Sequence, residues 1–176
     1  MHRLLIALGA CALGVGAVVA TAQTPTPAGP APAAQLRSGE TYLWSGELVS
    51  FDAGTRALTL RTRILSEAAP EVGRFTGGDH VLVTWSGLDI HAGAVRRVGR
   101  YDAAQPVLDF FALPAELASR DVPNDVITLR IRIPEASVAA VKGLKPGAWV
   151  TVTARQRPKT DADAIVGVAA YIRSQT

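Results

Sequence analysis

The sequence contains very little of the sulfur chemistry that stabilises many small exported domains. Its 176 residues include one cysteine, Cys11, and one methionine, Met1. Both lie in an N-terminal segment that we expect to be removed on export. The mature chain is therefore predicted to have neither a disulfide nor a thioether metal ligand. Its stability must then come from an apolar core, and no cofactor is predicted.

A strong excess of charge of one sign is also missing. Without the N-terminal segment the chain has 17 basic and 15 acidic residues, a net charge of +2, and only three of the basic residues are lysines. So small an excess does not favour nucleic-acid binding, which usually relies on a strongly basic surface. The preference for arginine, alanine and glycine over lysine favours a bacterial protein with a GC-rich genome.

Residues 1–22 have the three parts of a secretory signal peptide. Arg3 gives a positive start, Leu4 to Val19 carry no charge, and Ala20-Thr21-Ala22 supplies a small-x-small cleavage pattern. The alternative is a retained membrane anchor. The apolar stretch is shorter than the roughly 20 residues of a spanning helix, which favours cleavage. We expect a periplasmic or secreted protein of the bacterial envelope, with no stable membrane span after cleavage.

Two further segments follow the signal. Residues 23–38 are rich in proline and alanine without apolar periodicity, which predicts a flexible linker. Residues 39–176 are enough for one ordinary domain. Within this domain, a shift of 69 residues aligns repeat 42–101 with repeat 111–171. The matches include Thr59-Leu60-Arg61 with Thr128-Leu129-Arg130, and Val83-Thr84 with Val152-Thr153. Such a long-period match is the mark of an internal duplication.

Each repeat is predicted to contain two strands, a short helix or loop, and two more strands. Apolar residues alternate with polar ones from Leu58 to Ile64 and from Ile127 to Ile133, as expected of half-buried strands. Pro114 falls within the first expected strand of the second repeat. Because proline cannot donate to a sheet ladder, Leu113 to Ser119 is interpreted as a possible helical turn. The fold class is all-β, with tandem ββ(α)ββ repeats forming one barrel-like or sandwich-like domain and one or two short helices.

A glycine turn leads into the third strand of each repeat with the pattern G-x-x-V-x-V, from Gly78 and from Gly147. After an alternating hairpin, this pattern resembles the small OB-like β-barrel proteins that bacteria export. The resemblance implies two small OB-like barrels as an alternative architecture. An OB-like barrel would need one more strand between Ile64 and Phe75, where the sequence predicts none.

The strongest candidate surface for an anionic ligand or partner is a set of arginines at alternating positions of matching strands: Arg61, Arg63, Arg130 and Arg132. Guanidinium groups bind carboxylates and phosphates with two parallel hydrogen bonds. A solvated strand face is the competing interpretation, because exposed charge needs no special cause. Trp149 is out of phase with the core positions of its strand and is added as a contact candidate, whereas Trp85 is expected inside.

No catalytic or metal site is predicted. His80, His91 and Asp89 are weak candidates for metal ligands, because their spacing matches no common metal signature. Asp161 and Asp163 are interpreted as turn residues, and no serine lies in the strand-turn-helix context of a hydrolase. The sequence therefore favours an exported, non-catalytic protein that binds an envelope protein or an anionic ligand. An OB-type binder of small molecules or metal ions is the alternative, and a hydrolase is the least favoured class. The oligomeric state is not predicted.

Overall fold

The computed structural model describes residues 41–86 and 95–171. The chain separates into residues 1–34 and 35–176, and all described residues belong to the second part. The predicted signal peptide and the predicted linker lie outside the described residues. Within those residues, no helix is long and apolar enough to cross a membrane.

Eight strands and two short helices follow one another in an order that repeats halfway along the chain. The first half has β1 (Thr41–Asp52), β2 (Ala57–Arg63), α1 (Ala69–Val72), β3 (His80–Trp85) and β4 (Val95–Arg100). The second half has β5 (Ala112–Asp121), β6 (Val126–Arg132), α2 (Val138–Lys142), β7 (Trp149–Arg155) and β8 (Ile165–Ala170). Short 3-10 turns cover Ser66–Ala68, Val122–Asn124, Glu135–Ser137 and Asp161–Asp163.

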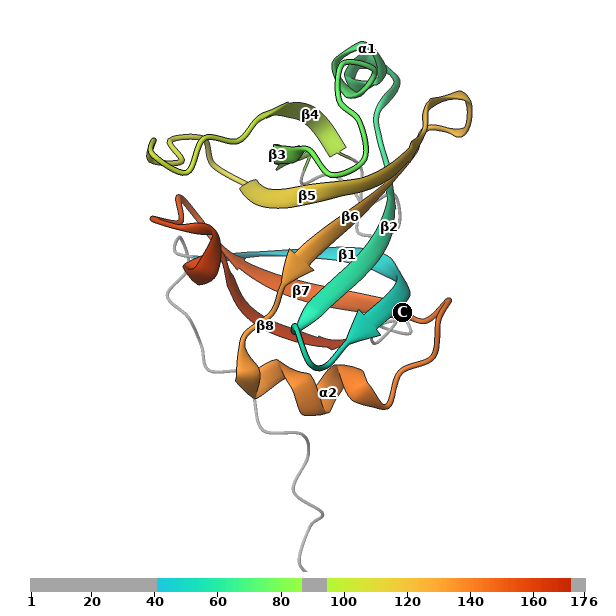
Figure 1. Ribbon diagram of the computed structural model, residues 1–176, viewed down its shortest axis with the longest axis vertical. Coiled ribbons are helices and arrows are strands. Elements are labelled where there is room, and N and C mark those ends of the chain that lie inside the picture. The colour runs from blue at the N-terminus through green and yellow to red at the C-terminus, as the bar shows by residue number, and fades with distance from the viewer. Residues whose placement is uncertain (1–40, 87–94, 172–176) are drawn as a thin grey trace, which may run out of the picture. The chain divides into compact units, whose positions relative to one another are not determined.

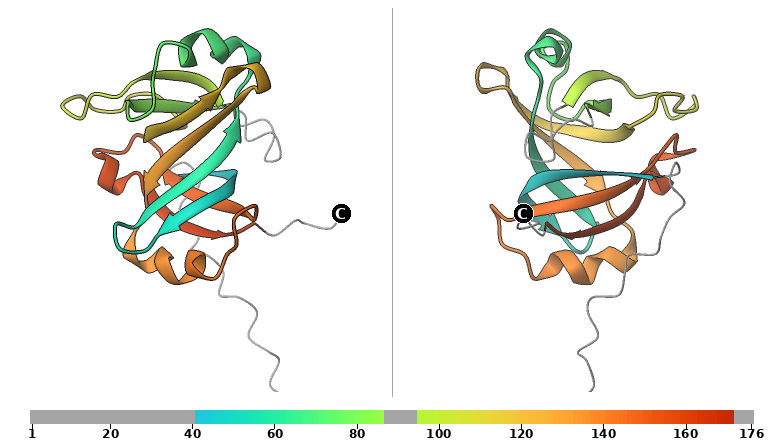
Figure 2. Two further views of the ribbon diagram at one scale, coloured as in Figure 1. Left: turned by 45° about the vertical axis from the view of Figure 1, so that its right-hand side comes forward. Right: turned by 180° about the vertical axis from the view of Figure 1, so that it is seen from behind.

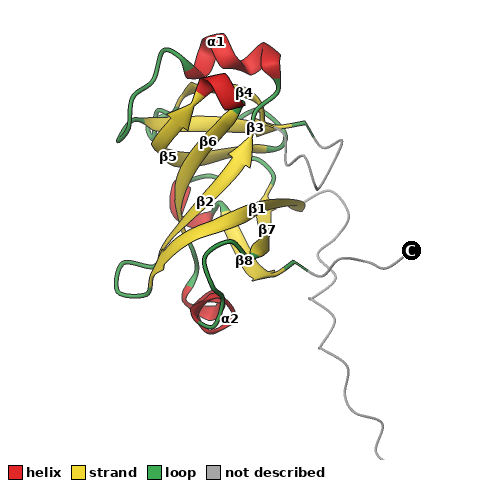
Figure 3. Cartoon of the chain, turned by 90° about the vertical axis from the view of Figure 1, so that its right-hand side faces the viewer, coloured by secondary structure: helices red, strands yellow, loops and turns green. Residues whose placement is uncertain are grey.

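All eight strands form one sheet in the order β4-β3-β5-β6-β2-β1-β7-β8, with antiparallel neighbours. The predicted all-β class with short helices is therefore confirmed. The sheet ends at β4 and β8 and is not closed, so a barrel is not confirmed. Figure 1 shows β3, β4 and β5 on the side of α1, and β1, β7 and β8 on the side of α2. The strands β2 and β6 run between these two groups, which is also clear in Figures 2 and 3.

The strand order reads the same from both ends when β1–β4 are exchanged with β5–β8. As a result, the β1–β2 hairpin pairs with β7, and the β5–β6 hairpin pairs with β3. The two central strands β2 and β6 are antiparallel, with Leu60 opposite Leu129. Each hairpin is thus hydrogen-bonded to strands of the other half of the chain.

Backbone irregularities fall at matching places in the two halves. The ladder shifts register at Leu48/Ser50 in β1 and at Leu117/Ser119 in β5. Arg56 and Asp125, which are 69 residues apart, both have a left-handed backbone with φ of 58° and 54°. These two residues end the tight connections before β2 and β6. A bulge increases local twist, so the paired bulges bend both long strands in the same way.

The core follows from the alternation seen in the sequence. β2 and β6 have the same pattern of burial, in which every second side chain is inside. A row of buried leucines crosses four neighbouring strands: Leu48, Leu60, Leu129 and Leu117. Trp85 is buried as predicted and stacks on Trp44 of β1, with ring centroids 4.3 Å apart. Since β1 and β3 are not neighbours in the sheet, this stack joins its two groups of strands.

The prediction of a helical turn at Leu113 to Ser119 is wrong, because these residues belong to β5. Pro114 lies opposite Leu82 of β3, and the ladder with β6 begins only at Glu116. Leu117 donates its N–H to the carbonyl of Asp79 and accepts from the N–H of Gly78, in the turn that leads into β3. Successive residues of a strand direct their main-chain groups to opposite sides, so Pro114, three residues before Leu117, directs its nitrogen away from β3. The missing donor therefore costs no ladder bond, and the strand tolerates proline.

Candidate functional site

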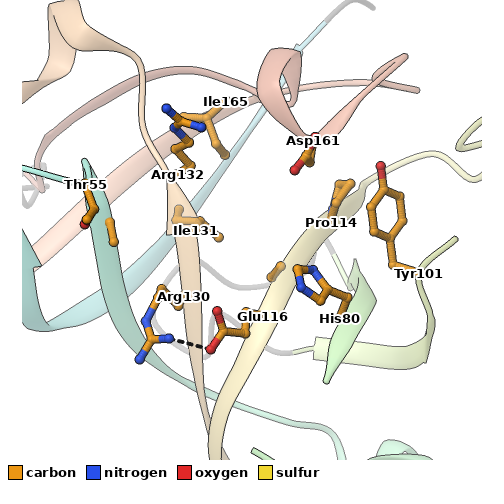
Figure 4. Close-up of a pocket in the computed structure, with 12 residues that line it drawn as sticks. Thr55, His80, Tyr101, Pro114, Glu116, Arg130, Ile131, Arg132, Asp161 and Ile165 are labelled. Carbon is orange, nitrogen blue, oxygen red and sulfur yellow. Dashed lines mark hydrogen bonds and ion pairs between the residues drawn. The ribbon is translucent and has the colours of Figure 1, made fainter. Parts of the chain in front are cut away.

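A pocket of about 420 Å³ opens where β5 and β6 run apart. Its volume lies in the lower part of the range usual for small-ligand sites, about 300–1,000 Å³. Figure 4 shows the two strands diverging from the Arg130–Glu116 pair, with Arg132 on one side and Tyr101 on the other. The lining residues come from both halves of the chain: Thr55, Ala57, His80, Tyr101, Pro114, Ala115, Glu116, Arg130, Ile131, Arg132, Asp161 and Ile165.

The pocket begins at the last pair of the β5–β6 ladder. That ladder ends with Glu116 opposite Arg130, and continuing its register would place Pro114 opposite Arg132. Proline cannot complete a hydrogen-bonded pair, because it has no N–H. The β1–β2 ladder ends at the corresponding pair, Glu47 and Arg61, where no proline follows. Proline is therefore compatible with the end of the ladder but is not required for it.

Two of the four predicted arginines are held by glutamates on neighbouring strands. Arg61 donates from Nε to the Glu47 carboxylate over 3.1 Å, and Arg130 forms an ion pair with Glu116. The Glu47 carboxylate raises the pKa of Arg61 above its usual value. Each pair is partly exposed to solvent, so its contribution to stability is small. The charges of these two arginines are already balanced.

The other two arginines, Arg63 and Arg132, form no ion pair with any described residue. All four guanidinium-bearing residues share the exposed face of β2 and β6, but they do not converge. Arg63 is paired with Val126, six residues from Arg132 along β6, which separates the two arginines by roughly 20 Å. Of the four arginines, Arg132 alone both lines the pocket and forms no ion pair with a described residue.

Tyr101 and Asp161 form the wall of the pocket that faces Arg132. Tyr101 follows the last residue of β4, and its N–H donates to the carbonyl of His80 over 3.2 Å. Burial, and then the negative charge of Asp161, raise the pKa of the Tyr101 hydroxyl. The hydroxyl is therefore protonated at neutral pH and available as a hydrogen-bond donor. Asp161 begins a 3-10 turn that is capped by Thr160 and Asp163, which fixes its position at the mouth.

The corresponding place in the other half of the sheet is occupied by a larger side chain. Trp149 opens β7 as His80 opens β3, and its ring lies against that of Tyr171 with centroids 6.4 Å apart. Trp149 is 38% exposed, in agreement with its predicted out-of-phase position. A histidine at this position occupies less volume beside Tyr101, so the difference between His80 and Trp149 contributes to the open space.

The site contains residues that sequence reasoning assigned elsewhere or missed. Asp161 was interpreted only as a turn residue, and Pro114 and Ile165 were not predicted as site residues. The available signal was Pro114, which interrupts an alternating strand. His80 lines the pocket, whereas His91 and Asp89 lie outside the described residues. No cluster of metal-binding side chains occurs in the described part of the chain.

No family model, curated protein or solved structure matches the chain.

Proposed function

We propose that the protein is an exported, non-catalytic binding domain that takes a carboxylate-bearing ligand in the pocket between β5 and β6. The observation that carries this proposal is Arg132, the one arginine of this pocket that forms no ion pair with a described carboxylate. A guanidinium donates two parallel hydrogen bonds to a carboxylate, and such charged bonds are among the stronger ones in proteins. The Tyr101 hydroxyl adds a neutral donor on the facing wall.

The lining favours a carboxylate over a phosphate. Ile131, Ile165 and Pro114 give the pocket apolar surface that suits an aliphatic or aromatic body. Asp161 and Glu116 also line it, and their negative charges repel a doubly charged phosphate more strongly than a single carboxylate. A ligand with one carboxylate and an apolar body fits this distribution.

The proposal extends to the architecture, which we infer to be a duplication of two OB-like units that share β2 and β6. Each half lacks one strand of an OB-like barrel, which in the first half would lie between Ile64 and Phe75. In this arrangement β6 supplies the missing strand to the first unit, and β2 supplies it to the second. The first unit would then comprise β5, β6, β2, β3 and β4, and the second β1, β2, β6, β7 and β8, five strands each. This is supported by the palindromic strand order and by the parallel bridge between Ile64 and Val95, which brings the end of β2 to β4.

The two units differ at this junction. Leu65 donates its N–H to the carbonyl of Val95 over 2.8 Å, next to the bridge. The residue 69 positions later is Pro134, which has no N–H to donate. The second unit would therefore be more open than the first at this junction. Sharing two strands makes each unit depend on the other for its completeness.

The binding proposal is tested by titrating the mature protein with benzoate, a carboxylate with a compact apolar body, and following backbone amide NMR shifts. Arg132→Ala should weaken benzoate binding by about tenfold or more, since a hydrogen bond to a charged group contributes about 1.5–3 kcal/mol. The matched control is Arg63→Ala, which removes the other arginine without an ion-pair partner among the described residues. Equal affinities for the wild type and Arg132→Ala would contradict the proposal.

A further inference from the structure

The wall of the pocket on the β6 side is made of main chain as well as side chain. The N–H of Ile133 donates to the carbonyl of Arg56 over 3.0 Å, so Ile133 faces β2. Successive residues of a strand direct their N–H and carbonyl groups to opposite neighbours. Arg132 therefore directs its main-chain groups away from β2, toward β5 and the pocket. The β5–β6 ladder has already ended at Arg130, so these groups have no ladder partner among the described residues.

The facing wall on β5 has the same property in part. Leu117 accepts from Gly78 over 2.8 Å and donates to Asp79 over 2.9 Å, so its main-chain groups face the turn that leads into β3. Alternation then turns Glu116 and Pro114 toward β6. The carbonyl of Pro114 points at the pocket, and no donor accompanies it. The two diverging strands thus present two carbonyls and one N–H to the space between them.

We propose that the ligand is the C-terminal end of an extended polypeptide, which enters between β5 and β6 and pairs with the main chain of Arg132. This inference rests on the proposed carboxylate-binding function. An extended chain carries both donors and acceptors along its edge and satisfies the free N–H and carbonyl of a strand, as in strand addition. Its terminal carboxylate binds the Arg132 guanidinium, and its apolar side chains contact Ile131 and Ile165. A small carboxylate would leave the main-chain groups to water.

The first test compares four probes on the mature protein by calorimetry. They are benzoate, an acetylated Thr-Val-Thr-Val peptide with a free C-terminus, the same peptide as its amide, and the free acid with all main-chain nitrogens methylated. The free acid should bind about tenfold tighter than benzoate, because two main-chain hydrogen bonds are added. Amidation, which removes the carboxylate, and N-methylation, which removes the main-chain donors, should each weaken the affinity about tenfold.

The second measurement is hydrogen exchange of the Arg132 amide at saturating free-acid peptide. Pairing with the peptide should slow this exchange about tenfold or more, while the Arg63 amide, which serves as the matched control, keeps its rate. If benzoate and both free-acid peptides bind equally and all depend on Arg132, the peptide inference is overturned and the carboxylate site remains. If neither benzoate nor the free acid binds, both proposals are overturned. Unchanged exchange at Arg132 in the saturated complex also overturns the peptide inference.

Discussion

Replacing Leu129 by alanine should destabilise both halves of the sheet at once. Leu129 is fully buried in β6, opposite Leu60 of β2 and Leu117 of β5, and so lies at the centre of the strand order. The substitution removes three carbons, worth about 2.4 kcal/mol at about 0.8 kcal/mol per buried methylene. The cavity left behind raises the total to about 3–5 kcal/mol. That is a large part of the roughly 5–15 kcal/mol that stabilises an ordinary domain.

Urea denaturation provides the assay, followed by tryptophan fluorescence and far-UV circular dichroism. Trp44 and Trp85 are stacked in the core and come from the two groups of strands, so their fluorescence reports on the junction. The two probes should give one coincident transition with a lower midpoint and an unchanged slope. The control is Leu43→Ala, the same chemical change at a side chain that is 63% exposed, which should alter stability by no more than about 0.5 kcal/mol.

Two results would refute the reasoning on Leu129. A loss below about 1 kcal/mol would mean that the central strands are not packed as described. Two separate transitions, one of them insensitive to Leu129→Ala, would mean that the two groups of strands unfold independently. The second result would also contradict the proposal that two units share β2 and β6, because units that share strands cannot unfold one at a time.

Two further predictions concern the pocket mouth and the turns. His80→Trp introduces the side chain that occupies the corresponding position in β7, so it should fill space beside Tyr101 and weaken benzoate binding. Trp149→His is the control and should leave the affinity for benzoate unchanged. Equal affinities of the two variants would exclude the role of His80. Stability should fall below about pH 4, because the Thr55 hydroxyl lowers the pKa of Asp52 and the Thr76 N–H lowers that of Asp79. A carboxylate whose pKa is lower in the folded state stabilises the fold above the unfolded pKa of about 3.9, and this contribution is lost as the pH falls through the folded pKa. Urea titrations between pH 2 and 7 should show a smaller decline in Asp52→Asn/Asp79→Asn, and an identical decline in the variant and the wild type would contradict this assignment.

The strands themselves were predictable because their signal is local. The alternation around Leu60 and Leu129 follows the two-residue period of a strand, and the buried side chains are the predicted ones. A short helix or loop was predicted between the second and third strands of each half, where α1 and α2 lie. The error at Pro114 has a clear cause. A proline excludes only one side of a strand from pairing, and the sequence does not tell which side is free.

The pairing between the two halves and the pocket could not be predicted, because both depend on contacts between distant residues. Nothing local to β1 indicates that Gly46 will lie opposite Val150 of β7 instead of a strand of its own half. The pocket arises from the point at which the β5–β6 ladder ends, and register is a property of two strands together. The arginines were identified by type and spacing, but their glutamate partners lie on other strands. For that reason the sequence could not separate Arg132 from Arg130.

The most direct test of the central claim is an amide map of benzoate binding to the isotope-labelled protein. Binding in the pocket predicts shifts concentrated at Ala115, Ile131, Arg132 and Ile165, with little change at the corresponding positions Gly46, Thr62 and Arg63. The shifts should disappear in Arg132→Ala and persist in Arg63→Ala. Shifts spread evenly over both sets of positions, or centred on the second set, would contradict the account.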